Sequence, residues 1–319
     1  MHFPGSPLKV VFMGTADLAC ASLRSLLDCP GCAVVAVVSQ PDKPKGRDLR
    51  LVATPVKQVA EAAGVPVLQP VKARLPEFLD QLRQIAPDLV VVAAYGQILP
   101  QALLDIPRLG CLNVHTSLLP RHRGAAPIQW AIAAGDAVTG VTIMKMDAGL
   151  DTGPMLSTVE TMISADDNGQ TLHDRLAQLG GELLVKTIPG YAAGLIAPRP
   201  QPAEGITYAR KITKDDGRID WNLPAVSNWN RIRAFTPWPG AFTRLPDTAD
   251  RSLLKVFRTS AEDTAGTPGT ILSADDTGLL VACGEGSLRI REMQREGGRR
   301  LAAGDFLRGC PLKPGQVLG

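Results

Sequence analysis

Short apolar runs rich in β-branched residues alternate with helix-like stretches from Lys9 to about Ala165. This alternation is typical of βα units, which require a mostly parallel sheet covered by helices. The expected strands are Lys9–Met13, Ala33–Ser39, Asp88–Ala94, Cys111–His115 and Val141–Met146. The expected helices are Asp17–Leu27, Pro55–Ala63, Leu75–Ile85 and Pro127–Ala134, followed by a longer helix, Leu172–Ile188, capped by Asn168 or Thr171. The pattern predicts a doubly wound, Rossmann-like α/β domain.

A proline-rich stretch then divides the chain. Pro189-Gly190 and the run from Pro198 to Pro202 disfavour helix and suit an extended linker. Beyond them, short strands alternate with turn signals such as Asp215-Asp216-Gly217, and one helix is expected at Ala225–Phe235. We therefore predict a first domain at 1–190, a linker at 191–210 and a small β-barrel domain at 211–319.

The composition fits two globular domains without membrane contact. Hydrophobic residues make up 45% of the 319 residues and charged residues 20%, which permits sizeable cores. The N-terminus lacks a charged start followed by a long apolar stretch, and no apolar run is long enough to span a bilayer, so we expect a cytoplasmic protein. Six cysteines in a chain of this size predict free thiols.

Two other features bear on function only weakly. Cys29 and Cys32 form a C-x-x-C, but no second pair stands at zinc spacing, so we expect no metal site and keep a redox role as the alternative. The net charge is +3, and residues 211–319 hold the whole excess, with 16 basic and 13 acidic residues. Such an excess is compatible with a nucleic-acid surface and equally with an ordinary solvated one.

Familiar phosphate-binding and hydrolase signatures are absent. The first strand ends in Gly14-Thr15-Ala16-Asp17, which matches neither the dinucleotide nor the P-loop pattern. The chain also has no G-x-S-x-G nucleophile elbow. The sequence therefore does not support dinucleotide, nucleoside-triphosphate or serine-hydrolase chemistry.

Polar residues concentrate between Asn113 and Asp151. Asn113 and His115 end a predicted strand, and strand alternation sends both to the same side, where open α/β sheets bind ligands. After a further strand, Asp151 arrives on a glycine-containing loop. These residues, with the intervening Ser117-Leu118-Leu119-Pro120, resemble the folate-dependent formyltransferases, a family that includes glycinamide ribonucleotide transformylase. The resemblance implies that Asn113, His115 and Asp151 are catalytic and that Ser117, Leu118, Leu119 and Pro120 line the folate pocket.

This residue set suits formyl transfer. An amine that attacks a formamide carbon builds negative charge on oxygen and positive charge on nitrogen, so donors such as Asn113 and His115 would stabilise the intermediate. The carboxylate of Asp151 favours the imidazolium form, fixes the ring and can relay the amine proton, directly or through water. Each residue alone also has a structural explanation: a turn cap, a buried histidine and a turn aspartate. Their order and spacing together favour the catalytic interpretation.

Two basic stretches favour aminoacylated tRNA as the acceptor. The insertion from Gln40 to Leu51 is long for a βα loop, and it resembles the loop by which tRNA-formylating members approach the acceptor end. Further on, the stretch Tyr208–Lys214 is similar to the linker that leads to an OB-like barrel in those members. The candidate tRNA contacts are Lys43, Lys45, Arg47, Arg50, Lys211 and Lys214. Asp48 places an acidic side chain beside Arg47, which weakens the interpretation that this loop contacts phosphates. The alternative is that it is an ordinary solvated surface loop.

The resemblance therefore implies transfer of a formyl group from 10-formyltetrahydrofolate to the amino group of methionine on initiator tRNA. The sequence does not determine the oligomeric state, and we expect a monomer. Three alternatives remain open: a formyltransferase acting on a sugar-nucleotide or other small amine, a 10-formyltetrahydrofolate hydrolase, and a non-catalytic RNA-binding module.

Overall fold

The computed structural model describes residues 6–45, 50–246 and 252–319. The chain folds into two compact units. The N-terminal unit comprises the described parts of 1–127, 138–162 and 173–209, and the C-terminal unit comprises those of 128–137, 163–172 and 210–319. The residues after the long helix, up to Ala209, therefore pack within the N-terminal unit.

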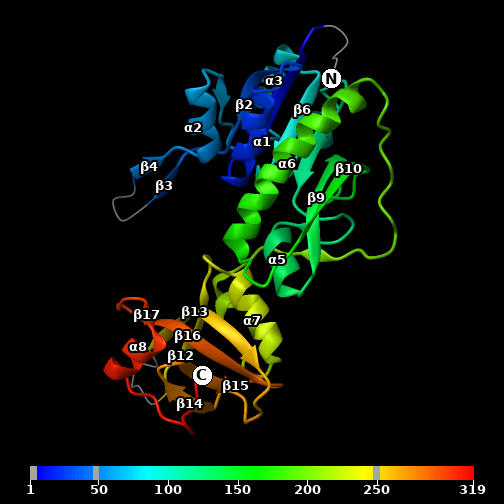
Figure 1. The fold of residues 1–319 in the computed structure, drawn as a ribbon. Helices are drawn as coiled ribbons and strands as arrows, with labels where there is room; N and C mark the ends of the chain where they lie inside the picture. Colours follow the sequence, from blue (N-terminus) through cyan, green and yellow to red (C-terminus); the bar gives the residue numbers. More distant parts are fainter. Residues whose placement is uncertain (1–5, 46–49, 247–251) are drawn as a thin grey trace. The chain divides into compact units, whose positions relative to one another are not determined.

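A seven-stranded sheet forms the centre of the N-terminal unit (Figure 1). Its order is β10-β9-β7-β6-β1-β2-β5. The strands are β1 (Leu8–Gly14), β2 (Cys32–Val38), β5 (Val67–Leu68), β6 (Leu89–Ala93), β7 (Cys111–His115), β9 (Val138–Lys145) and β10 (Met155–Met162). The first five in this list pair in parallel, which confirms the doubly wound α/β prediction.

The sheet differs from the expected parallel pattern at one edge. β9 runs antiparallel to β7, and β10, which the sequence pattern missed, runs antiparallel to β9. The expected strand Val141–Met146 is thus present but begins at Val138 and has the opposite direction. β10 lacks a continuous apolar signal because it is a half-exposed edge strand that carries Ser157, Thr158 and Glu160.

Helices cover both faces of this sheet. They are α1 (Leu18–Leu27), α2 (Pro55–Ala62), α3 (Pro76–Ile85), α4 (Gln101–Leu104) and most of α6 (Gly169–Ala192). The remaining helix of this part of the chain, α5 (Pro127–Ala133), belongs from Ile128 on to the C-terminal unit. Val11 and Met13 of β1 pack in one core with Phe78 and Leu82 of α3, and the alternate residues of β1 are fully buried as well. Burial on both sides explains why the central strands read as continuous apolar runs.

The long helix α6 begins after Asn168, whose side-chain oxygen accepts from the backbone N–H groups of Gln170 and Thr171. The helix continues through Pro189 to Ala192, beyond the expected end at Ile188. Figure 1 shows α6 crossing the sheet beside α1. The approach is close, because a Cβ built on Gly180 would lie 2.8 Å from Val114.

Two short strand pairs complete the N-terminal unit. β3 (Lys43–Lys45) pairs antiparallel with β4 (Arg50–Val52), so the described ends of the basic insertion form a hairpin. β8 (Arg123–Gly124) pairs in parallel with β11 (Tyr208–Ala209). The second pair ties the chain that follows α6 to the loop that follows β7.

The C-terminal unit is an antiparallel β domain, and in its described residues it also contains α5, two further α-helices and a short 3-10 helix, Lys214–Gly217. The strand order is β12-β13-β16-β15-β14, with β17 on β16. These strands are β12 (Ala241–Arg244), β13 (Leu253–Glu262), β14 (Ile271–Asp275), β15 (Gly278–Ala282), β16 (Ser287–Arg295) and β17 (Leu301–Ala302), with helices α7 (Ala225–Ala234) and α8 (Ala303–Gly309). The helix expected at Ala225–Phe235 is confirmed. Among the described strands no pair joins β12 to β14, so the sheet shows the predicted β class without a closed ring.

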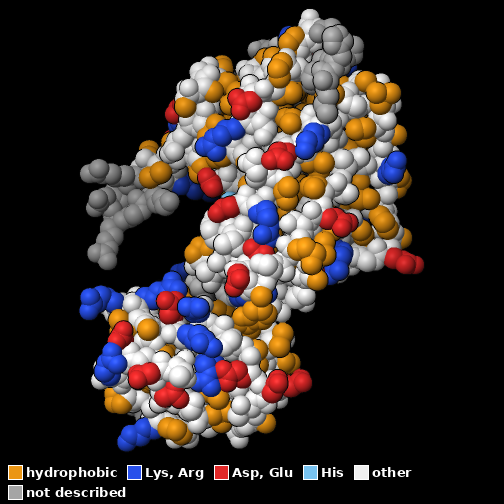
Figure 2. Space-filling view, in the orientation of Figure 1, with side chains coloured by type: hydrophobic (Ala, Val, Ile, Leu, Met, Phe, Trp, Pro, Cys, Tyr) orange, Lys and Arg blue, Asp and Glu red, His pale blue; other side chains and the backbone are white. Residues whose placement is uncertain are grey.

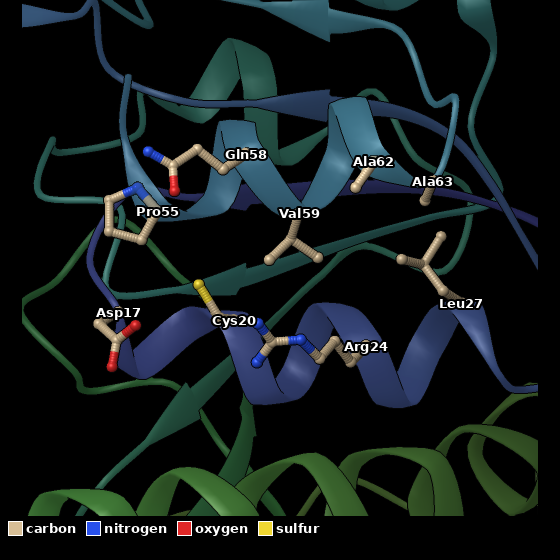
Figure 3. Close-up of a pocket in the computed structure, with 9 residues that line it drawn as sticks. All are labelled: Asp17, Cys20, Arg24, Leu27, Pro55, Gln58, Val59, Ala62 and Ala63. Atoms are coloured by element: carbon tan, nitrogen blue, oxygen red, sulfur yellow. The ribbon is translucent and has the colours of Figure 1, made fainter. Parts of the chain in front are cut away.

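All six cysteines are free, as expected. Cys20 points from α1 toward α2 in a surface hollow of about 450 Å³ between these helices (Figure 3). Burial is the main reason why the pKa of the Cys20 thiol is raised.

In the described part of the chain, no helix has both the length and the apolar character needed to cross a bilayer. The same residues contain no group of three His, Cys, Asp or Glu side chains placed to hold a metal.

Candidate active site

A cavity of about 550 Å³ lies at the carboxyl ends of β6 and β7. It brings together the three predicted catalytic residues, Asn113, His115 and Asp151. The rest of its lining comes from the start of α1, from β6, β7 and the segments that follow them, from the residues that lead into α5, and from the loop after β9. These residues are Leu18, Val92, Ala94, Tyr95, Gly96, Gln97, Ile98, Leu99, Val114, Thr116, Gly124, Ala125, Pro127, Met146, Asp147, Ala148, Gly149 and Leu150. The position matches the crevice that open α/β sheets use for ligands.

The carboxylate of Asp151 lies at the centre of the polar contacts. Its Oδ2 accepts a 2.7 Å hydrogen bond from the backbone N–H of Gly124 and lies 3.7 Å from Nδ1 of His115. Its Oδ1 accepts a longer, 3.4 Å bond from the side-chain amide of Asn113. The side chain of Asp151 is 14% exposed and that of His115 is 6% exposed. A largely buried carboxylate is therefore fixed between the amide and the imidazole.

Gly124 is required where its N–H meets Asp151. Its φ is +120°, a conformation that side chains with a Cβ rarely adopt. A Cβ at this position would also lie 2.6 Å from the carbonyl oxygen of Ala209 in β11. The sequence shows the glycine but not its role, because the contact uses a backbone group.

His115 has a defined tautomer when it is neutral. Its Nε2 lies 3.0 Å from the backbone carbonyl oxygen of His122. A carbonyl can only accept, so Nε2 carries the hydrogen. In the neutral ring, Nδ1 is then an unprotonated nitrogen facing Asp151. His122 supplies this contact through its backbone, and sequence reasoning missed it.

Burial and the carboxylate act in opposite directions on His115. Burial, the larger effect, lowers the pKa of His115, while the negative charge of Asp151 and the hydrogen bond to His122 raise it. The net pKa lies below the ordinary value of 6.5. Asp151 thus favours the imidazolium in the expected direction, but desolvation outweighs it and the resting ring is neutral near pH 7.

Backbone strain concentrates around this site. Among the described residues, the non-glycine positions with positive φ are Ala86, Ala94, His122 and Asp151. Ala94 and Asp151 line the cavity, and His122 bonds to His115. Each such residue costs of order 1–3 kcal/mol and persists only where its surroundings hold it, a pattern common at functional sites.

The predicted folate-binding residues Ser117, Leu118, Leu119 and Pro120 are all described, and none of them is part of the cavity lining. Ser117 is buried, and its hydroxyl donates to the carbonyl of Arg121 at 2.6 Å. The backbone N–H of Leu119 donates to the hydroxyl of Thr142 on β9. The apolar side chains of the cavity wall include Leu18, Tyr95, Ile98 and Leu99 instead.

The predicted tRNA-binding residues are distributed over both units. Lys43 is exposed, and its ammonium donates to the side chain of Gln40. Lys45 and Arg50 lie in the β3–β4 hairpin, and Arg47 lies outside the described residues. Lys211 and Lys214 are exposed at the start of the C-terminal unit.

Comparison with known families gives matches to two models. One, described as formyl transferase, matches residues 8–188. The other, described as formyl transferase, C-terminal domain, matches residues 211–311.

The chain is similar to curated proteins over nearly its whole length. It is 54% identical to the methionyl-tRNA formyltransferase of Citrifermentans bemidjiense, across 98% of this chain and 96% of that protein. It is 53% identical to the methionyl-tRNA formyltransferase of Myxococcus xanthus, across 96% of each.

Solved structures share the fold at lower identity. An N-formyltransferase from Helicobacter canadensis, in complex with folinic acid and dTDP-3-aminofucose, is 17% identical with a TM-score of 0.64, covering 89% of this chain and 98% of that one. HypX from Aquifex aeolicus, in complex with tetrahydrofolic acid, is 18% identical with a TM-score of 0.59, covering 98% of this chain and 51% of that one.

Proposed function

The chain belongs to the formyl transferase family, and on that basis we propose that it transfers the formyl group of 10-formyltetrahydrofolate to the free amino group of methionine esterified to initiator tRNA. The observation that carries the proposal is the cavity wall in which the Asp151 carboxylate lies between the Asn113 amide and the His115 imidazole.

The three side chains have complementary roles in this reaction. The amine nitrogen attacks the formyl carbon, a carbon–nitrogen bond forms, and the carbonyl oxygen becomes an oxyanion. The Asn113 amide donates to that oxygen, and the unprotonated Nδ1 of neutral His115 accepts the proton that the attacking nitrogen loses. The Asp151 carboxylate stabilises the resulting imidazolium. Collapse of the intermediate breaks the bond to the folate nitrogen, which takes the proton from the His115 imidazolium as it leaves, so that the imidazole is neutral again.

The cavity suits the folate substrate. Its volume of about 550 Å³ falls in the range of roughly 300–1,000 Å³ typical of pockets for drug-sized ligands. Tyr95, Leu18 and Leu99 give it apolar walls on which an aromatic ring can pack. We also propose that Ser117, Leu118, Leu119 and Pro120 contribute to the folate pocket, where they follow Thr116 of the cavity lining.

The C-terminal unit offers a surface for the tRNA. A groove of about 890 Å³ is lined by four arginines and two aromatic residues. Arg258 and Arg291 are exposed there, where each can meet a phosphate. Figure 2 shows Lys and Arg side chains gathered on this unit, with acidic ones among them. We assign tRNA contacts to this groove and to Lys43, Lys45, Arg47, Arg50, Lys211 and Lys214.

This function fits the proposed division into a catalytic domain at 1–190, a linker at 191–210 and a tRNA-binding domain at 211–319. We further propose that the protein acts as a monomer. Because the product is used by ribosomes, we propose a cytoplasmic location.

Acceptor competition tests the proposal. The protein would be mixed with 10-formyltetrahydrofolate labelled in the formyl group and with equal concentrations of methionyl-initiator tRNA and dTDP-3-aminofucose, the sugar named with the Helicobacter canadensis structure. We expect the label in methionyl-tRNA. Label in the sugar would instead support a small-amine formyltransferase, and label released as formate without either acceptor would support a hydrolase.

A further inference from the structure

The chain that follows α6 returns to the active-site loops. Arg199 exchanges two 2.8 Å backbone hydrogen bonds with Met155 at the start of β10. Further on, β11 pairs with β8, which carries the Gly124 N–H that binds Asp151. We call residues 199–209 the return segment. All of it belongs to the N-terminal unit.

Gln201 of the return segment uses both ends of its side-chain amide. The NH₂ group donates to the backbone carbonyl of Asp151 at 2.7 Å and to that of Gly153 at 2.8 Å. The amide oxygen accepts from Nε and from a terminal nitrogen of Arg123, at 3.0 and 2.6 Å. With both amide hydrogens and both oxygen lone pairs engaged, the amide has one orientation that satisfies all its partners.

Gln201 contacts two different kinds of partner, the buried guanidinium of Arg123 and the backbone of the turn at Asp151. Arg123 is 7% exposed, so its guanidinium requires an acceptor. Asp151 adopts a left-handed conformation, with φ of +52°, which is uncommon for a residue other than glycine and which aspartate tolerates better than most. Within this exposed turn, the Asp147 carboxylate accepts from the backbone N–H of Gly149 at 3.0 Å and from the hydroxyl of Thr152 at 2.7 Å, and Gln201 adds the bonds to the backbone carbonyls. Gln201 therefore links a firmly buried cation to the strained turn that carries the carboxylate.

We propose that Gln201 is a positioning residue, which holds the Asp151 turn so that its carboxylate faces His115 and Asn113. It touches neither substrate nor the reacting atoms, and it acts through the backbone of Asp151. The role rests on the proposed function of Asp151. Displacement of a reacting group by about 1 Å can cost on the order of a hundredfold in rate, so loss of this contact should lower turnover more than binding.

Thr207 makes a parallel contact on the other side of the site. Its hydroxyl accepts from the backbone N–H of His122 at 2.8 Å, and His122 in turn accepts from His115. The return segment thus contacts two of the left-handed residues of the site, His122 and Asp151.

The test compares Gln201→Ala and Gln201→Glu with Gln178→Ala. Glu at 201 keeps an acceptor for Arg123 but cannot donate to the two carbonyls, so it should be as impaired as Ala. Gln178 is exposed on α6, donates only to Glu182 and serves as the matched control. We expect kcat to fall about 10- to 100-fold in both Gln201 variants, with KM for each substrate and Kd for tetrahydrofolate within twofold of wild type.

A second measurement does not depend on the acceptor. The titration of the His115 ring, followed by NMR, should shift to lower pH in Gln201→Ala, because the carboxylate is no longer held beside it. If wild type fails to formylate tRNA, this shift still supports the positioning role. An unchanged titration with kcat within twofold of wild type would overturn it. So would a kcat loss that follows a fall in Tm and disappears on cooling, because that marks a purely structural role.

Discussion

The Nε2–H of His115 donates to the backbone carbonyl of His122 across 3.0 Å, and this one contact determines how the imidazole can act. It leaves Nδ1, 3.7 Å from the Asp151 carboxylate, as the nitrogen available for proton transfer. Since burial keeps the ring neutral near pH 7, His115 begins the reaction as a proton acceptor and becomes a donor only after it has been protonated.

Replacement of Asn113 by Ala should lower kcat by roughly a hundred- to a thousandfold, because it removes a donor to the oxyanion. KM for 10-formyltetrahydrofolate should change little. Steady-state kinetics with methionyl-tRNA checks this. Asn222→Ala, which removes an exposed amide bonded to Asp220, is the control and should match wild type. Equal activity in Asn113→Ala would remove Asn113 from the mechanism.

The pH dependence should follow His115. Its folded pKa lies below the ordinary 6.5, so the unfolded chain binds more protons between the two values, and the stability that neutral His115 contributes is lost as the pH falls below about 6.5. Activity should fall as the pH is lowered, with an apparent pKa under 6.5, because protonated His115 cannot accept the proton of the amine. In Asp151→Asn, the NMR titration of His115 should move lower still, because the carboxylate raises this pKa. A shift to higher pH would contradict the assigned interaction.

Gly124→Ala should lower both stability and activity. Its Cβ would clash with the Ala209 carbonyl, and the strained backbone would pull the N–H away from Asp151. Gly194→Ala is the matched control: φ is +72°, yet nothing lies within 4 Å of the added Cβ. We expect about 1 kcal/mol of destabilisation and full activity in the control, and a larger loss with at least tenfold lower kcat in Gly124→Ala. Thermal unfolding and kinetics together separate the two.

Arg258→Ala and Arg291→Ala should weaken tRNA binding without affecting the chemistry. Each removes about one phosphate contact, so the slope of log K against log salt should become shallower by about 1 per substitution, while saturating kcat is unchanged. Filter binding across a salt series measures this. Arg83→Ala, which removes an exposed arginine paired with Asp80 on α3, should keep the wild-type slope. If the groove variants also keep it, tRNA does not contact this groove.

How far the sequence predicts the structure depends on the kind of signal. The parallel core strands carry continuous apolar runs, and Asn168 is a conventional helix cap, so both were predictable. β10 was missed because its edge position leaves alternate residues polar and exposed. Helix α6 passes Pro189 near its last turn, where one missing N–H costs less than in the helix centre.

The same distinction holds at the site. Strand alternation pointed Asn113 and His115 to one crevice, the family resemblance added Asp151, and the cavity contains all three. Their partners could not be read from the sequence, because the Gly124 N–H and the His122 carbonyl belong to the backbone. Gln201 lies 50 positions from Asp151, in a stretch that reads only as a proline-rich linker.

The most direct measurement of the central claim is the mass of the amino acid released from initiator tRNA after methionyl-tRNA is mixed with 10-formyltetrahydrofolate and the protein. Wild type should give N-formylmethionine rapidly, and His115→Ala and Asp151→Ala should give it at least a hundredfold more slowly. Unmodified methionine with wild type, or equal rates in all three proteins, would contradict the account.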